Sequence, residues 1–260
     1  MNVPVSQFYD NIAPLYDNAM EAGFISRFIS RRFQEFLVEK FQSAGTVLDV
    51  GCGSGTDALF LGGQGVRVVG FDISPGMIQI AREKAAAAGL EEFVQFSTGD
   101  ATRLNGLGDR RFDGAYSNFN VLNHLEDLGG FAKSLAEKLL PGAPVVLTMM
   151  NRVCVPEVLG YLARLRLATA VRKLWSRQDT LALRMHLYFP TETVRHLEPC
   201  FSVQRIEGFG LLLPPAQLYK GKYFRRFFNI MAALERPLLR LFPFYQFCDI
   251  YILILKKNES

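Results

Sequence analysis

Residues 47–55 read Val47-Leu-Asp-Val-Gly-Cys-Gly-Ser-Gly55, a short apolar run that passes into three alternating glycines. Glycine has no Cβ atom, so the chain can turn sharply here and a ligand can lie directly against the backbone. The pattern predicts a strand, a tight loop and the start of a helix whose first N–H groups are unpaired. A Gly-x-Gly loop is typical of nucleotide-like ligands but does not by itself distinguish between cofactors.

Further apolar runs flank this loop along the chain, and turn residues follow each of them. They predict a series of short strands, over residues 46–50, 66–71, 94–98, 112–117 and 145–149. Helical patterns lie between them, the clearest over 75–88, where Ser74 is the expected N-cap and Gly89 ends the helix. The alternation of strand and helix predicts right-handed crossovers and a parallel sheet that is covered on both faces.

Two carboxylates follow the second and third of these strands and narrow the choice of ligand. Asp72 lies 21 residues after Gly51, where a carboxylate can accept hydrogen bonds from both hydroxyls of a ribose. Asp100 ends the third strand and can accept a hydrogen bond from an exocyclic amine such as that of adenine. A nicotinamide dehydrogenase shares the glycine loop and the acid at Asp72 but does not explain Asp100. Its Gly-x-Gly-x-x-Gly spacing also differs from the Gly-x-Gly-x-Gly found here.

In order, these motifs resemble those of the class I S-adenosylmethionine-dependent methyltransferases of the small-molecule type, methyltransferase domains 11 and 25. The resemblance rests on Asp49-Val-Gly-Cys-Gly-Ser-Gly55, Asp72, Gly99-Asp-Ala101, Phe112-Asp-Gly-Ala-Tyr-Ser-Asn118 and Leu140-Pro-Gly142. Phe8-Tyr-Asp-Asn-Ile-Ala-Pro-Leu-Tyr-Asp17 is similar to the N-terminal cap of many small-molecule members, including those that methylate quinones. The resemblance covers about residues 8 to 150.

The resemblance implies a Rossmann-like α/β fold with a seven-stranded, mostly parallel sheet, helices on both faces and helical lid insertions. Apolar stretches near 203–213 and 249–255 fit the antiparallel closing hairpin of that family. We therefore expect a single domain over residues 1–260. Its expected parts are an N-terminal helical cap (1–42), a cofactor-binding core (43–152), and lid or acceptor-binding insertions (153–188 and 214–247).

The resemblance also implies S-adenosyl-L-methionine as the cofactor and S-adenosyl-L-homocysteine as its product. Asp72 would hold the ribose, Asp100 the adenine edge, and Asn118 would face the transferring methyl. The full set of residues expected to contact the cofactor is Tyr16, Asp49, Gly51, Cys52, Gly53, Asp72, Ile73, Met77, Asp100, Ala101, Asn118 and Phe119.

Two histidines are candidates for a catalytic base. His124 follows the fourth strand, and His186 precedes a helix that usually borders the acceptor pocket in the family. Imidazole titrates near neutral pH, which suits proton transfer. A base is not required, however, because alignment of the acceptor with an already electrophilic sulfonium methyl supplies much of the rate.

Composition restricts the partners. The net charge of +4 is mild, and the basic residues form no concentrated stripe. Ser117-Asn-Phe-Asn120 also stands where amino-methylating nucleic-acid enzymes carry an Asn-Pro-Pro-Tyr motif. A nucleic-acid substrate is therefore not expected. The four cysteines include no Cys-x-x-Cys pair, so neither a metal site nor a disulfide framework is expected. No signal peptide is recognisable at the N-terminus, which favours a cytoplasmic protein.

The acceptor is expected to be a small molecule, largely apolar, because Phe and Leu are concentrated in the two insertions. The basic, aromatic stretch at 219–228 could also bring the protein to an anionic membrane surface. The sequence leaves the methylated atom (O, C or N) and the oligomeric state open. It also leaves open a partner-binding or regulatory protein that kept the fold and lost catalysis.

Overall fold

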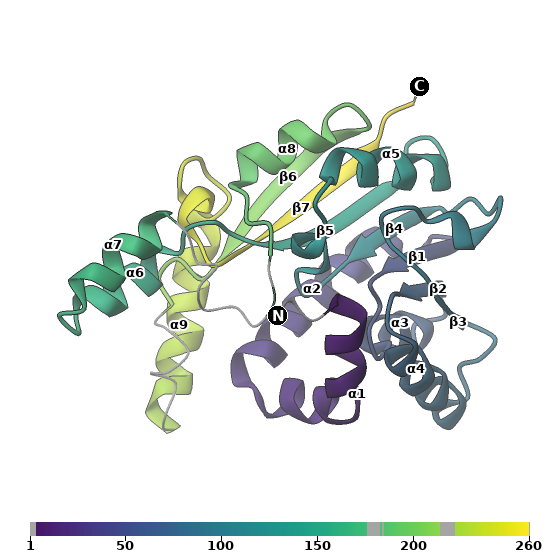
Figure 1. The fold of residues 1–260 in the computed structure, drawn as a ribbon, viewed down its shortest axis with the longest axis horizontal. Coiled ribbons are helices and arrows are strands. Elements are labelled where there is room, and N and C mark those ends of the chain that lie inside the picture. Colours follow the sequence, from purple (N-terminus) through teal and green to yellow (C-terminus); the bar gives the residue numbers. More distant parts are fainter. Residues whose placement is uncertain (1–3, 176–182, 184, 214–221, 260) are drawn as a thin grey trace.

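The computed structural model of the protein describes residues 4–175, 183, 185–213 and 222–259. Its centre is a seven-stranded sheet with the strand order β3-β2-β1-β4-β5-β7-β6 (Figure 1). The strands are β1 (Thr46–Val50), β2 (Arg67–Asp72), β3 (Val94–Thr98), β4 (Gly114–Ser117), β5 (Pro144–Met150), β6 (Phe201–Phe209) and β7 (Ile250–Lys257). β1 to β5 run parallel, and β7 is antiparallel to both β5 and β6. The predicted fold class is therefore confirmed.

Helices cover both faces of the sheet. The helices are α1 (Val5–Ala22), α2 (Phe24–Phe41), α3 (Thr56–Gly62), α4 (Pro75–Ala88), α5 (Leu128–Lys138), α6 (Val155–Leu162), α7 (Leu167–Trp175), α8 (Pro190–Leu197) and α9 (Lys222–Leu238), with 3-10 turns η1 (Asn105–Leu107), η2 (Val121–His124) and η5 (Phe244–Phe247). Apolar residues of α2, α3 and α4 form one core with the sheet, and those of α5 and α8 form the other. Each of these five helices therefore buries one apolar stripe against the strands.

Local signals at helix ends place α4 where the sequence predicts it. The Ser74 hydroxyl accepts a hydrogen bond from the backbone N–H of Met77, and Pro75 occupies the first helical position. Gly89 ends the helix in the left-handed conformation with φ of 64°. Because α4 begins directly after β2, its N-terminus lies at the carboxyl edge of the sheet, next to Asp72.

The described helices of the two insertions lie toward one edge of the molecule. In Figure 1, α6, α7 and α9 stand together on the left, at the β6 end of the sheet, while α3 and α4 lie at the β3 end. α1 crosses the carboxyl edge near α4, below the sheet in this view. Among the residues that the structure describes, no helix is both long and apolar enough to span a bilayer.

Candidate cofactor-binding site

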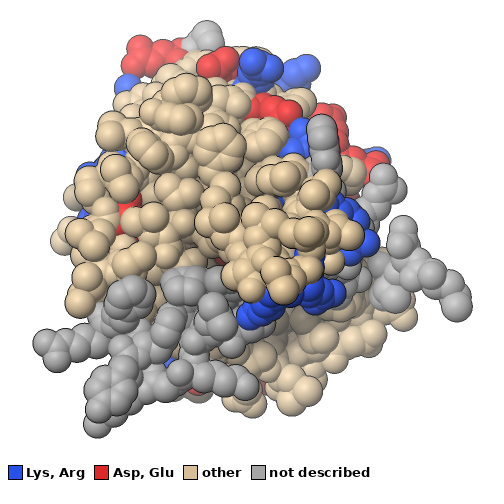
Figure 2. All heavy atoms as spheres, turned by 90° about the vertical axis from the view of Figure 1, so that its left-hand side faces the viewer, with Lys and Arg blue, Asp and Glu red and all other residues tan. Residues whose placement is uncertain are grey.

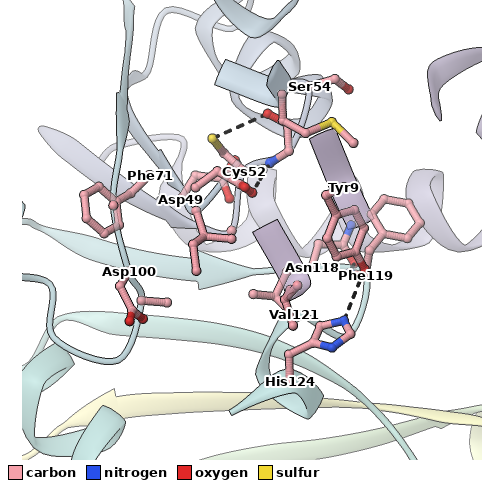
Figure 3. Close-up of a pocket in the computed structure, with 18 of the residues that line it drawn as sticks. Tyr9, Asp49, Cys52, Ser54, Phe71, Asp100, Asn118, Phe119, Val121 and His124 are labelled. Carbon is pink, nitrogen blue, oxygen red and sulfur yellow. Dashed lines mark hydrogen bonds between the residues drawn. The ribbon is translucent and has the colours of Figure 1, made fainter. Parts of the chain in front are cut away.

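A cavity of about 270 Å³ opens at the carboxyl ends of β1, β2 and β4, beside α1 (Figure 3). The twelve residues predicted to contact the cofactor all line this cavity, and so does His124. The convergence follows from the topology, because the carboxyl ends of parallel strands that are neighbours in the sheet meet at one edge. Further lining residues that the motifs did not single out are Val5, Tyr9, Ser54, Thr56, Asp57, Phe71, Gly99, Thr102, Val121 and Leu125.

The loop after β1 has a backbone conformation that requires glycine at two positions. Gly51 has φ of 74°, and a Cβ atom built there would lie 2.4 Å from a methyl carbon of Val121. Gly53 has φ of 51° and donates its N–H to Oδ2 of Asp72 at 2.8 Å. An L-residue at either position would be strained, and at Gly51 it would also displace the turn after β4. The loop therefore keeps its backbone open to the cavity.

Asp72 is oriented by the backbone on either side of it. One carboxylate oxygen accepts the Gly53 N–H, and the other accepts the N–H of Ser74 at 2.9 Å. Burial raises the pKa of Asp72, and these hydrogen bonds oppose that rise because they favour the charged form. Its two oxygens are thus fixed at the cavity wall, and their remaining lone pairs can accept from a diol.

The cavity is acidic. Asp49, Asp57, Asp72 and Asp100 line it, and its described lining contains no lysine or arginine. Burial and then the neighbouring charge of Asp57 raise the pKa of Asp49 well above its usual range, and burial raises the pKa of Asp57. Carboxylates gathered in this way favour a ligand that carries positive charge, whereas the phosphates of a dinucleotide would be repelled.

The turn after β4 is held in an unusual backbone conformation. Phe119 and Asn120 have φ of 52° and 63°, a region that costs residues other than glycine about 1–3 kcal/mol each. The side chain of Asn118 fixes this turn, because its Oδ1 accepts the N–H of Phe119 at 2.8 Å while its Nδ2 donates to Oδ2 of Asp57 at 2.7 Å. The amide group thereby links the turn to the acidic wall of the cavity.

Helix α1 is fastened over the cavity by two aspartates seven residues apart. Asp10 accepts hydrogen bonds from the Ser74 hydroxyl at 2.6 Å and from the Gly76 N–H at 2.9 Å. Asp17 accepts from the hydroxyl of Ser54 and from the Lys84 ammonium group, the latter at 2.9 Å. Residues seven apart lie on one side of a helix, so both carboxylates reach the loops that surround the cavity.

The tyrosines that precede these aspartates line the cavity. Tyr9 and Tyr16 pack edge to face with ring centroids 6.5 Å apart. The hydroxyl of Tyr9 lies 3.1 Å from Nε2 of His124, and Figure 3 shows this contact below the Tyr9 ring. Burial, with a smaller effect from the charge of Asp72, raises the pKa of Tyr9 to about 12. The seven-residue repeat of Tyr-Asp was the sequence signal that could have identified Tyr9 and Asp10.

His186 lies near the same turn but is not among the described residues that line this cavity. Its backbone N–H donates to the carbonyl of Asn123 at 2.6 Å, and its carbonyl accepts from Nδ2 of Asn123 at 2.8 Å. The described lining likewise includes no residue of the insertions at 153–188 and 214–247. The lid role of these insertions and the catalytic role of His186 stay predictions, and residues 176–182, 184 and 214–221 lie outside the described part.

Comparison with known proteins agrees with this architecture. Residues 47–142 match the methyltransferase domain family. The chain is 28% identical over 158 residues to 2-heptyl-1-hydroxyquinolin-4(1H)-one methyltransferase of Mycobacteroides abscessus, which covers 58% of this chain and 67% of that protein. It is 33% identical over 148 residues to demethylmenaquinone methyltransferase of Bacteroides fragilis, across 55% of this chain and 58% of that one. The aligned stretches thus span about three-fifths of these relatives.

A solved structure shares the fold over nearly the whole chain. The [4+2]-cyclase SpnF superposes with a TM-score of 0.67 and covers 98% of this chain and 96% of its own. At 19% sequence identity, this likeness shows the fold alone. It extends beyond residues 47–142, which the family match covers, and the division of the chain into one domain with two insertions stays a prediction.

Proposed function

We propose that this chain, which has a class I methyltransferase domain, transfers a methyl group from S-adenosylmethionine to a small, lipophilic acceptor. The observation that carries the proposal is the charge of the cavity, which four aspartates line without a described lysine or arginine. S-adenosylmethionine has an ammonium and a sulfonium group, and a carboxylate-lined cavity stabilises both. The same charges count against a nicotinamide dinucleotide, whose pyrophosphate is anionic.

The lining residues fit the parts of that cofactor. Asp72, with both oxygens oriented by backbone N–H groups, would hold the ribose diol. Asp49 and the loop at Gly51 would receive the ammonium end, and Met77 would lie beside the adenine. When bound, the cofactor supplies a methyl group on a positively charged sulfur. The protein then has to exclude water, orient the acceptor and, for an acidic acceptor, take up a proton.

The pair formed by Tyr9 and His124 can take up that proton. An acceptor hydroxyl that contacts Tyr9 would pass its proton to the tyrosine oxygen as Tyr9 gives its own proton to Nε2 of His124. The net change is one proton moved from the acceptor to the imidazole, and Tyr9 regains its neutral form. The raised pKa of Tyr9 favours this neutral form before and after the transfer.

Apolar lining and the named relatives favour a lipophilic acceptor. Val5, Phe119, Val121 and Leu125 line the cavity around the Tyr9–His124 pair. One relative is named for a hydroxyquinolinone with a heptyl chain, and another for a quinone. Both names describe ring compounds, and the first places a hydroxyl on the ring. We therefore propose oxygen on a ring as the first methylated atom to test, ahead of carbon and nitrogen.

The first experiment is calorimetric titration of the purified protein with S-adenosylmethionine, S-adenosylhomocysteine and NAD. Binding of the two adenosyl ligands without NAD supports the proposal, and binding of NAD alone overturns it. Methyl transfer from labelled S-adenosylmethionine to a 1-hydroxyquinolinone and to a demethylated quinone then tests the acceptor class. A protein that binds the cofactor and methylates neither class would instead fit the alternative, a regulatory or partner-binding protein that has lost catalysis.

A further inference from the structure

The hairpin of α6 and α7 has its apolar side chains on the outside. On α7, Leu167 and Val171 are 61% and 55% exposed, and Leu174 is exposed as well. The opposite side of the same helix faces α6, and there Lys173 is only 1% exposed and lies 3.5 Å from the carboxylate of Glu157. A helix on a water-exposed surface normally has the reverse arrangement, with leucines inside and lysines outside.

The turn between the two helices continues this outer surface. Leu165 at its tip is 86% exposed and has φ of 56°, so its side chain projects from the hairpin instead of folding back onto it. We define the outer face of the hairpin by its exposed apolar residues, which are Leu159, Leu162, Leu165, Leu167, Val171 and Leu174. Six exposed apolar side chains gathered on one short hairpin are expected where a protein contacts another apolar phase.

Apart from Glu157, which pairs with the buried Lys173, the charges on the hairpin are all basic. Residues 158–175 contain Arg164, Arg166, Arg172 and Lys173 and no acidic residue. Arg164 and Arg166 alternate with leucines at the tip, and both are exposed. Figure 2, which faces the side of α6, α7 and α9, shows a broad uncharged surface with a group of Lys and Arg beside it. Leucines that protrude among arginines fit the boundary between anionic headgroups and acyl chains.

We infer that the outer face of the hairpin is a peripheral membrane-docking surface for bilayers that contain anionic lipid. The protruding, convex tip favours insertion into a bilayer over docking into a protein pocket, and the single sign of its charge selects anionic headgroups. Helix α9, on which Ile230 and Leu234 are also exposed, stands on the same side of the molecule as the hairpin (Figure 1). This surface is distinct from residues 219–228, most of whose side chains lie outside the described part.

The test is sedimentation of the full chain with vesicles of phosphatidylcholine alone and of phosphatidylcholine with about 30% phosphatidylglycerol. We expect the protein to bind the anionic vesicles, and to bind them less at about 1 M salt than at about 0.1 M because the charges are then screened. The variant Leu165→Asn/Leu167→Gln/Val171→Gln should partition roughly tenfold more weakly or worse, because three inserted apolar side chains are lost. Asn tolerates the left-handed conformation at position 165, so the turn should keep its shape.

Two further variants make the result decisive. Arg164→Gln/Arg166→Gln should lose most of the preference for anionic vesicles, by roughly tenfold, since each arginine near the surface contributes to the electrostatic attraction. Leu140→Gln, an exposed leucine in the turn before β5, is the matched control and should bind as the unaltered protein does. Equal binding by the triple variant, or a dimer in light scattering that the triple variant abolishes, would overturn the inference. The latter would make the surface a contact between copies of this chain.

Discussion

The hydroxyl of Tyr9 lies 3.1 Å from Nε2 of His124, which follows it by 115 residues. The two residues come from the cap helix α1 and the turn η2, so their contact exists only when the cap is docked over the strand ends. The cover over the cavity and the proposed proton relay therefore both depend on the docking of α1. Loss of the cap would open the cavity and separate the pair at the same time.

Tyr9→Phe removes the hydroxyl but keeps the ring. If Tyr9 relays the acceptor proton, kcat should fall by about 100-fold or more, the usual size of a general acid–base contribution. Affinity for S-adenosylmethionine, measured by calorimetry, should change little. The double variant with His124→Gln should be no slower than the slower single variant, because the two groups act as one relay. Independent, multiplying losses would contradict the relay, and Tyr245→Phe in η5 serves as the distant control.

The pH dependence of the reaction should contain no limb from Tyr9 in the range where most assays are run. Burial raises its pKa to about 12, so Tyr9 stays protonated up to strongly alkaline pH. Any basic limb of kcat between about pH 9 and 10 must then arise from another group, such as the acceptor itself. A limb in that range that disappears in Tyr9→Phe would show that the hydroxyl is less buried during turnover.

Asp72→Ala tests the ribose assignment. Two hydrogen bonds to a charged acceptor contribute about 1.5–3 kcal/mol each, so cofactor affinity should fall by roughly 100-fold or more. Thermal unfolding would establish that the variant folds. Asp127→Ala is a suitable control, because Asp127 caps α5 by accepting the Gly130 N–H and is not a lining residue. Unchanged cofactor affinity in Asp72→Ala would remove the basis for the assignment.

The parts of the site that could be predicted from the sequence are those carried by single strand ends. Asp72 and Asp100 were predictable because each follows an apolar run, and parallel strands bring their carboxyl ends to one edge. Asp57 was not predicted, because it faces the cavity only through the packing of α3 against Asn118 and Gln34. Tertiary contacts of this kind leave no periodic signal.

Which face of a helix is buried also depends on tertiary contacts that the sequence does not reveal. The pattern of α7 predicts an amphipathic helix, but it does not reveal that the side carrying Lys173 is buried and the side carrying Leu167 is exposed. The buried Lys173 lies 3.5 Å from the carboxylate of Glu157 of α6, which is close in space only after the hairpin forms. The sequence also predicted membrane contact at 219–228, which stays a prediction because most of those side chains lie outside the described part; the surface we propose lies on α6 and α7.

Asp10→Asn tests how the cap is held. The hydrogen bonds that Asp10 accepts from the Ser74 hydroxyl and the Gly76 N–H lower the pKa of Asp10. Its charged form therefore stabilises docking above the usual carboxyl pKa, and this contribution is lost as the pH falls through the lowered value. The neutral amide should imitate that loss at pH 7. Hydrogen exchange in residues 5–22 should become faster, while β1 and β2 should exchange as before; faster exchange throughout would indicate general destabilisation.

Asp49→Asn should trade function against stability. Burial and the charge of Asp57 raise the pKa of Asp49, so the ionised group lowers the stability of the ligand-free protein at neutral pH, and this cost is relieved as the pH falls through the raised pKa. The amide removes the charge, and we expect a gain of about 1 kcal/mol, equivalent to a rise in Tm of roughly 2–4 °C. Cofactor affinity should fall about tenfold as the ammonium group loses its partner. Asp113→Asn is the matched control, because the Asp113 carboxylate accepts the N–H of Thr46, the first residue of β1, at 2.7 Å. This change should lower Tm and leave the affinity for the cofactor unchanged. A lower Tm in Asp49→Asn would mean that the carboxylate supports the fold, and the acidic wall would then no longer argue for a cationic cofactor.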